Sequence, residues 1–138
     1  MEVATDFPYG HTYGLRHVAG APVAMSEEDV VTAEALRAEG IAARVLNVAF
    51  IEPLDTAAVL SAAAETRGIV VVEEATSTGG LGAAVATLTA QERPARLRLL
   101  GVPRAFAPTG STAFLWEHFG LTAVDIAAAA RDIMAHAR

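Results

Sequence analysis

Cysteine is absent from this chain of 138 residues, so disulfide bonds, zinc–thiolate sites and thiol nucleophiles are excluded. No apolar run approaches the roughly 18 to 20 residues that a membrane-spanning helix needs. The N-terminus also lacks the basic stretch and apolar run of a secretory signal. These absences favour a cytoplasmic protein that has no membrane partner.

Positive charge is scarce as well, and lysine is absent. The ten basic residues are all arginine and are scattered through a chain whose net charge is −6. A nucleic-acid partner is therefore not expected, because a phosphate backbone is bound by a basic patch or stripe. The four histidines show no metal-ligand spacing, since no two of them flank an acid at positions i and i+4 of one helix. We expect no metal site in this chain.

One segment carries the clearest structural signal. Ile-Val-Val-Val at 69–72 predicts a central parallel strand that is buried on both faces, because four β-branched apolar residues follow one another. Two acids, Glu73 and Glu74, end the strand. Gly79 and Gly80 then allow a tight reversal, and a helical apolar pattern follows.

Strand and helix patterns alternate along the chain. The predicted strands lie within 16–25 and at 41–48, 69–74 and 95–102. The predicted helices lie at 26–39, 56–67, 80–91 and 111–119, and from 122 to the C-terminus. Ser111 and a Thr122–Asp125 capping box are the predicted starts of the last two helices. Such alternation indicates βαβ crossovers and a mainly parallel sheet between two layers of helices.

The first 15 residues differ from the rest. Positions 6–14 hold two glycines, a proline and three aromatic residues, which is too irregular for a regular element and too aromatic for a disordered tail. We predict an extended aromatic arm at 1–15, ahead of a domain at 16–138, that packs on this domain or on a partner. Its interface candidates are Phe7, Tyr9, His11 and Tyr13. His11 is also the one histidine that could assist proton transfer or bind substrate, if the arm reaches a partner's active site.

Ligands of parallel sheets bind beyond the carboxyl ends of the strands. Three predicted loops meet at this edge, at 49–54, 75–79 and 103–110. The candidates for an anion site or a loop cavity there are Glu74, Thr78, Gly79, Gly80 and Arg104. Backbone N–H groups at the following helix start could hold an anion, and an arginine could bind an anionic substrate or a partner carboxylate.

A structural interpretation stands beside each of these candidates. Adjacent strand residues point to opposite faces, so Glu73 and Glu74 cannot act together on one atom, and we favour a strand end with one acid facing the loops. The glycine turn lacks the Lys-Ser/Thr of a P-loop, so tight strand-to-helix packing is favoured over phosphate binding. Trp116 lies on a short helix that is apolar over more than one face, which makes it an interface candidate.

A family resemblance rests on the order and spacing of several segments. They are AEGIAARVLN (38–47), IEPLD (51–55), VVVEE (70–74), GGLGAAV (79–85), GVPRAF (101–106), TGS (109–111) and FGLTA (119–123). Together they resemble the C-terminal domain of the transketolase family, the third domain of thiamine-diphosphate enzymes such as transketolase and deoxyxylulose-phosphate synthase. The resemblance implies a three-layer α/β/α sandwich with a mostly parallel five-stranded sheet, in which one edge strand could run antiparallel. Between Leu15 and Ser26 the chain is several residues shorter than the family pattern.

The resemblance also implies where the cofactor belongs. In this family thiamine diphosphate and Mg²⁺ lie between two other domains, and this sequence has no Gly-Asp-Gly followed at the family's distance by Asn. We therefore expect a non-catalytic C-terminal subunit of a split, hetero-oligomeric transketolase-like enzyme. Its partner subunits would carry the diphosphate- and pyrimidine-binding domains, and the assembly would transfer a two-carbon ketol unit. The isolated chain is expected to be inactive.

The alternative is a free-standing module derived from the same domain, which binds a small anion or a regulatory partner through the loops around Thr78 and Arg104.

Overall fold

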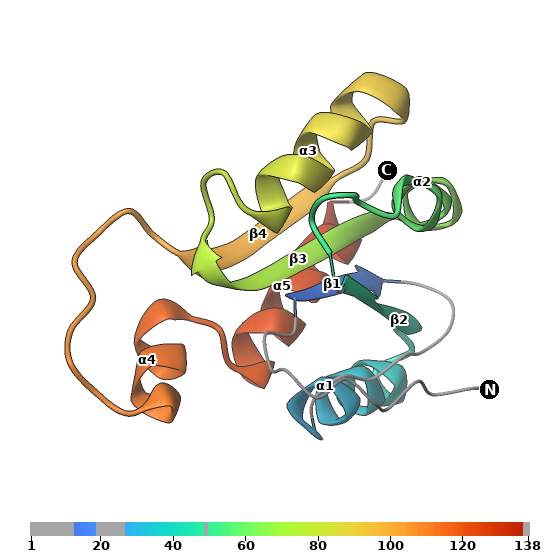
Figure 1. Ribbon diagram of the computed structural model, residues 1–138. Helices are drawn as coiled ribbons and strands as arrows, with labels where there is room; N and C mark the ends of the chain where they lie inside the picture. The colour runs from blue at the N-terminus through green and yellow to red at the C-terminus, as the bar shows by residue number, and fades with distance from the viewer. Residues whose placement is uncertain (1–12, 19–26, 49, 137–138) are drawn as a thin grey trace.

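The computed structural model describes residues 13–18, 27–48 and 50–136 (Figure 1). Its strands are β1 (Tyr13–Val18), β2 (Ala43–Val48), β3 (Gly68–Thr76) and β4 (Leu97–Val102). Its helices are α1 (Glu27–Ala38), α2 (Thr56–Glu65), α3 (Leu81–Glu92), α4 (Thr112–Phe119) and α5 (Ala123–Ala135). Within these ranges, no helix is both long and apolar enough to cross a bilayer.

The elements form three layers, as predicted. The sheet has the strand order β2-β1-β3-β4, with α1 and α5 on one face and α2 and α3 on the other (Figure 1). β3 lies in the middle of both cores, because Val70 and Val72 pack toward α1 and α5 while Ile69 and Val71 pack toward α2 and α3. This confirms the prediction, made from the apolar run at 69–72, of a strand buried on both faces.

The antiparallel strand is confirmed, but its predicted place at the edge of the sheet is wrong. β1 lies between β2 and β3 and runs antiparallel to both. β2 and β3 therefore run in the same direction without touching, and β4 continues parallel to β3. The described part of the chain supplies four strands, so the predicted fifth is not found there. β1 takes this position because it pairs along its length with both neighbours, as at Arg16, which lies opposite Val45 of β2 and Val70 of β3.

The place of β1 can be tested because the chain has no cysteine. Leu15 pairs with Val71, and paired Cα atoms of antiparallel strands are about 4.5 to 5.5 Å apart, which suits a disulfide. Leu15→Cys with Val71→Cys is expected to oxidise to an intramolecular disulfide in nearly all molecules. Leu15→Cys with Val70→Cys is the control, because adjacent strand residues point to opposite faces. Thiol alkylation and mass spectrometry measure both, and equal oxidation of the two pairs would contradict the register.

Two helix starts follow the predicted capping chemistry. Ser111 Oγ accepts a hydrogen bond from Phe114 N at 3.2 Å at the start of α4. At the start of α5, Thr122 Oγ1 accepts from Asp125 N at 3.4 Å, and Thr122 N donates to Asp125 Oδ2 at 3.0 Å. These caps satisfy backbone groups that would otherwise be unpaired and fix where the two helices begin.

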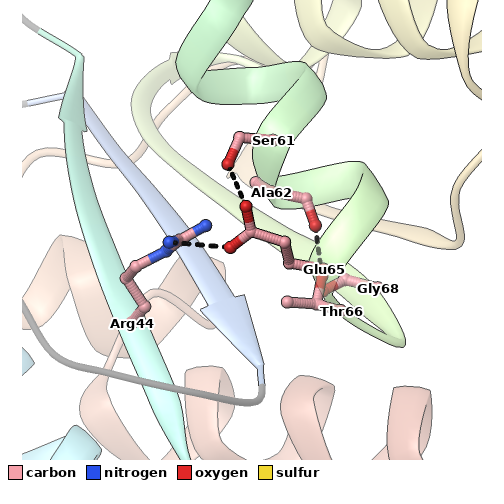
Figure 2. Close-up of polar contacts among 6 residues, drawn as sticks. All are labelled: Arg44, Ser61, Ala62, Glu65, Thr66 and Gly68. Atoms are coloured by element: carbon pink, nitrogen blue, oxygen red, sulfur yellow. Dashed lines mark hydrogen bonds and ion pairs between the residues drawn. The ribbon is translucent and has the colours of Figure 1, made fainter.

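Polar contacts fasten α2 beside β2 (Figure 2). The Arg44 guanidinium of β2 donates to Glu65 Oε2 at 3.2 Å, and Ser61 Oγ donates to Glu65 Oε1 at 2.6 Å. Thr66 Oγ1 donates to the Ala62 carbonyl at 2.6 Å, where the helix ends. These bonds hold the C-terminal end of α2, in the crossover from β2 to β3. The loops that follow β2 and β3 lie at the opposite end of the sheet and therefore start from elements that are fixed in place.

A bidentate ion pair joins Arg131 of α5 to Glu39, the residue that follows α1. Arg131 Nε and one of its terminal nitrogens donate to the two Glu39 carboxylate oxygens at 2.7 and 2.6 Å. These hydrogen bonds lower the pKa of Glu39 below its ordinary value of 4.5. Because the folded-state pKa is the lower one, the pair stabilises the fold above that ordinary value, and the contribution is lost as pH falls through the lowered pKa.

Arg131→Gln is therefore expected to lower the melting temperature slightly at pH 7 and to lose this effect at an acid pH below the lowered pKa of Glu39. Circular-dichroism melts at the two pH values measure the difference from the parent chain. Arg37→Gln, on the exposed last turn of α1, is the matched control. A deficit of the Arg131 variant that stays constant with pH would contradict the pairing.

Candidate functional site

Four chain segments lie at the end of the sheet where β2, β3 and β4 finish, which we call the carboxyl edge. Because β2, β3 and β4 run in the same direction, the loops that follow them leave from one side (Figure 1). β1 runs the other way, and its first residue, Tyr13, pairs with Val48 at the end of β2. The segment predicted as an aromatic arm therefore joins the sheet at this edge. Phe7, Tyr9 and His11 of that arm lie outside the described residues.

The turn from β3 to α3 is built around a buried carboxylate. The Glu73 side chain is 2% exposed. Its Oε2 accepts a hydrogen bond from Leu81 N at 2.9 Å, and its Oε1 accepts one from Gly82 N at 3.1 Å. Both donors belong to the first turn of α3, whose unpaired N–H groups and helix dipole favour a negative charge.

The sequence candidate at this position was the neighbouring acid. Glu74 is exposed, while Glu73 shares the α3-facing side of the strand with Ile69 and Val71. The predicted arrangement, in which one acid faces the turn and the other does not, agrees with this alternation. Because residues 69–72 are all buried, alternation along the strand alone does not tell which of the two acids faces α3.

Three glycines leave room for this carboxylate. A Cβ placed on Gly80 would overlap Glu73 Oε2 and lie 2.9 Å from Glu73 Cδ. A Cβ on Gly82 would lie 3.1 Å from Glu73 Oε1, and one on Gly101 would lie 3.1 Å from Glu73 Cγ. Gly80 occupies the N-cap position of α3 without a capping side chain, so the Glu73 carboxylate supplies the cap from β3.

The tip of this turn is exposed. Thr78 and Gly79 both lie on the surface, and Gly79 has a φ of +88°, which favours glycine. Ser77 N donates to the Val102 carbonyl at 3.1 Å, which binds the loop after β3 to the end of β4. Gly79 and Gly80 therefore serve the reversal and close packing. The helix N-terminus beside them already holds an anion, which is the protein's own carboxylate.

The loop after β4, at 103–110, carries an exposed cation and a fully exposed aromatic ring. It extends away from the sheet before α4 begins (Figure 1). Arg104 is exposed, and it makes no hydrogen bond or ion pair with any described residue. The relative exposure of Phe106 is 106%, and that of Phe50, which follows β2, is 68%. The loop after β4 thus presents an apolar ring and an unpaired positive charge, and a second exposed ring follows β2.

α4 presents a different aromatic residue from the one predicted. Trp116 is half-buried and packs with Phe119 against the core under α1 and α5. Phe114 is 45% exposed and stacks on His118, with 5.8 Å between ring centroids. The outward aromatic of this short helix is therefore Phe114, and Trp116 turns mainly inward.

Residues 23–126 match the family described as "Transketolase, C-terminal domain". The chain belongs to this transketolase C-terminal domain family.

Relatives of known name extend the match. The chain is 42% identical over 109 residues to the 6-deoxy-6-sulfo-D-fructose transketolase subunit SqwH of a Clostridium species, covering 79% of this chain and 34% of that protein. It is 40% identical over 140 residues to 1-deoxy-D-xylulose-5-phosphate synthase of Heliobacterium modesticaldum, covering 96% of this chain and 21% of the synthase. The chain thus spans about a third or less of these relatives.

A solved structure shares the fold. It is described as "Split gene transketolase, inactive beta4 tetramer", with a TM-score of 0.73 and 34% identity, covering 79% of this chain and 36% of that one. The resemblance drawn from the sequence segments, and the mixed α/β fold with a parallel sheet that it implied, are confirmed.

Proposed function

We propose that this chain is the non-catalytic C-terminal component of a split transketolase-like enzyme. It completes and stabilises a thiamine-diphosphate-dependent assembly in the cytoplasm that transfers a two-carbon ketol unit. The observation that supports this most is that 42% identity links the chain to a protein named as a transketolase subunit. A structure described as a split-gene transketolase supports the same proposal.

The cofactor is proposed to belong to the partner subunits. Within the described residues, no group of three or more histidine, aspartate and glutamate side chains could hold a metal ion. Among the described residues, Glu73 is the one buried acid at the candidate edge, and the amides of Leu81 and Gly82 already engage it. This donor set does not fit Mg²⁺ or a diphosphate, so no step of the reaction is assigned to this chain.

The carboxyl edge is proposed as the surface that meets the partner. Arg104 offers an unpaired cation for a partner carboxylate, and Phe106 offers exposed apolar area on the same loop. Phe50 offers a further exposed ring after β2. Tyr13, the last aromatic residue of the predicted arm, pairs with Val48 at the same edge, and Phe7, Tyr9 and His11 stay predicted interface residues. Aromatic and arginine side chains of this kind are enriched among the residues that carry binding energy. Trp116 remains an interface candidate only through its exposed part.

The alternative, a free-standing anion-binding module, has less structural support. Its proposed site was the loops around Thr78 and Arg104, including the turn at Gly79 and Gly80, where a helix start could hold an anion. The Glu73 carboxylate lies on those helix amides. An external phosphate would have to displace a buried side chain that brings the same charge.

The experiment is co-expression of the full chain with the products of adjacent genes. Size-exclusion chromatography with light scattering measures assembly, and a ketol-transfer assay with and without thiamine diphosphate measures activity. We expect a hetero-oligomer whose activity requires this chain. A monomer or homo-oligomer that captures no thiamine-dependent partner, and whose absence leaves ketol transfer unchanged, would overturn the proposal.

A further inference from the structure

The buried carboxylate of Glu73 sits where other helices bind an external anion. We propose that Glu73 is a built-in anion, a positioning residue that holds the N-terminus of α3 and through it fixes the turn at 76–80. The inference concerns the chain by itself and does not depend on the proposed function. Only the position of the turn, at the proposed partner-facing edge, connects the two.

The hydrogen-bond geometry is that of a bound carboxylate. Each Glu73 oxygen has its own backbone donor, Leu81 N at 2.9 Å and Gly82 N at 3.1 Å. A helix start has four unpaired N–H groups, and Gly80 at the N-cap has no side chain to accept from them. A carboxylate that accepts two such bonds satisfies the donors and lies at the positive end of the helix dipole.

The space around the carboxylate is shaped to fit it. Gly80, Gly82 and Gly101 come from the turn, from α3 and from β4, and a Cβ on any of them would press on the Glu73 side chain. If the Glu73 side chain only filled space, glycine would not be needed at three positions around it. Because Gly101 belongs to β4, the carboxylate also sits at the junction of β3, β4 and α3.

The consequence for the turn follows from its neighbours. Ser77 N bonds to the Val102 carbonyl, and Thr78 N bonds to Thr76 Oγ1 at 3.4 Å. These contacts tie one end of the turn to the sheet, and Glu73 ties the other end to the helix. Without the carboxylate, the first turn of α3 loses its cap and the 76–80 segment loses one of its two anchors.

The test removes the Glu73 carboxylate by mutation and then supplies a small carboxylate in solution. Glu73→Ala in the full chain is expected to lower the melting temperature by about 10 °C, as for loss of a buried charged hydrogen-bond acceptor. Sodium formate supplies a carboxylate of the right size. It is expected to raise the melting temperature of this variant several degrees more than sodium chloride at equal ionic strength, and to leave the parent chain unchanged relative to chloride.

Two matched variants separate the charge from the loss of volume. Val71→Ala removes a fully buried apolar side chain from the same face of β3, and formate is not expected to rescue it. Glu73→Gln keeps the shape and removes the charge, and it is expected to lose much of the stability while remaining folded. Amide hydrogen exchange of Leu81, Gly82 and Thr78 in this variant is expected to accelerate at least about tenfold, while exchange in the β3 core stays slow.

Several outcomes would overturn the inference. Formate could stabilise all variants equally, or fail to rescue Glu73→Ala at any concentration that leaves the parent chain folded. Glu73→Gln could match the parent in melting temperature and in exchange. If Glu73→Ala does not fold, the Glu73→Gln exchange measurement decides alone. If the chain is obtained only with its partner, the same variants are compared in the complex. A chain with no partner can still pass this test, so the two proposals can fail separately.

Discussion

Arg104→Glu combined with Phe106→Ala is expected to weaken binding of the partner subunits by at least about 100-fold. Ketol transfer by the assembly is expected to fall as binding is lost. Both side chains lie on the loop after β4, and Phe106 is fully exposed. Neither change removes a contact that stabilises this chain, so the melting temperature should move by only a degree or two. The charge reversal places a negative group where we propose a partner carboxylate, which adds repulsion to the loss of the ring.

The matched control for the charge is Arg93→Glu. Arg93 is exposed and ends α3, at the opposite edge of the sheet from Arg104. Val124→Ala serves as the apolar control, because Val124 is 74% exposed on the first turn of α5. Surface-immobilised binding measurements at two salt concentrations compare all variants. If the two controls weaken binding as much as the Arg104 and Phe106 changes, the carboxyl edge is not the docking surface.

Local sequence signals predicted the parts of this fold that depend on neighbouring residues. The apolar run at 69–72 gave β3, because a strand buried on both faces needs apolar residues at every position. Ser111 and the Thr122–Asp125 pair gave the starts of α4 and α5, because a cap and its backbone donor lie within three residues. In these cases the physical cause acts over one turn or one strand.

Non-local pairing explains what the sequence did not reveal. The strand at Tyr13–Val18 has no strong apolar pattern, and its place between β2 and β3 depends on partners far away in the chain. The family resemblance had implied an antiparallel strand at an edge. At the candidate site, Arg104 and the glycine turn were predicted at the correct edge, yet the acid was assigned to Glu74. Which of two adjacent acids faces a helix depends on the register of the whole strand, set by β1 and β4.

Gly80→Ala is expected to have the largest effect on stability among conservative changes at the turn, about 2 to 4 kcal/mol in the free energy of unfolding. The backbone of Gly80 is extended and would accept alanine, so the effect is steric. The new methyl group would overlap Glu73 Oε2 and come within 3.1 Å of the Thr76 carbonyl. Either the carboxylate leaves the amides of α3, or the turn moves away from β3.

Gly79→Ala is the control one residue earlier. A Cβ there meets no atom within 4 Å, but φ is +88°, so backbone strain alone should amount to about 1 kcal/mol. Urea denaturation followed by circular dichroism measures both variants. If Gly80→Ala is no less stable than Gly79→Ala, the carboxylate has room to move and the steric argument fails.

A double-mutant cycle connects this prediction to the carboxylate itself. In a Glu73→Ala background, the methyl group of Gly80→Ala no longer meets the carboxylate, and only the 3.1 Å approach to the Thr76 carbonyl remains. The second substitution is therefore expected to destabilise the chain by less than about 1 kcal/mol. The coupling between positions 73 and 80 should then account for most of the effect of Gly80→Ala alone. Additive effects would mean that the glycine serves the backbone of the turn and not the carboxylate. Strong coupling would mean that Glu73 and Gly80, seven positions apart, form one structural unit. The carboxylate caps α3, and the lack of a Cβ at Gly80 gives the carboxylate the room to do so.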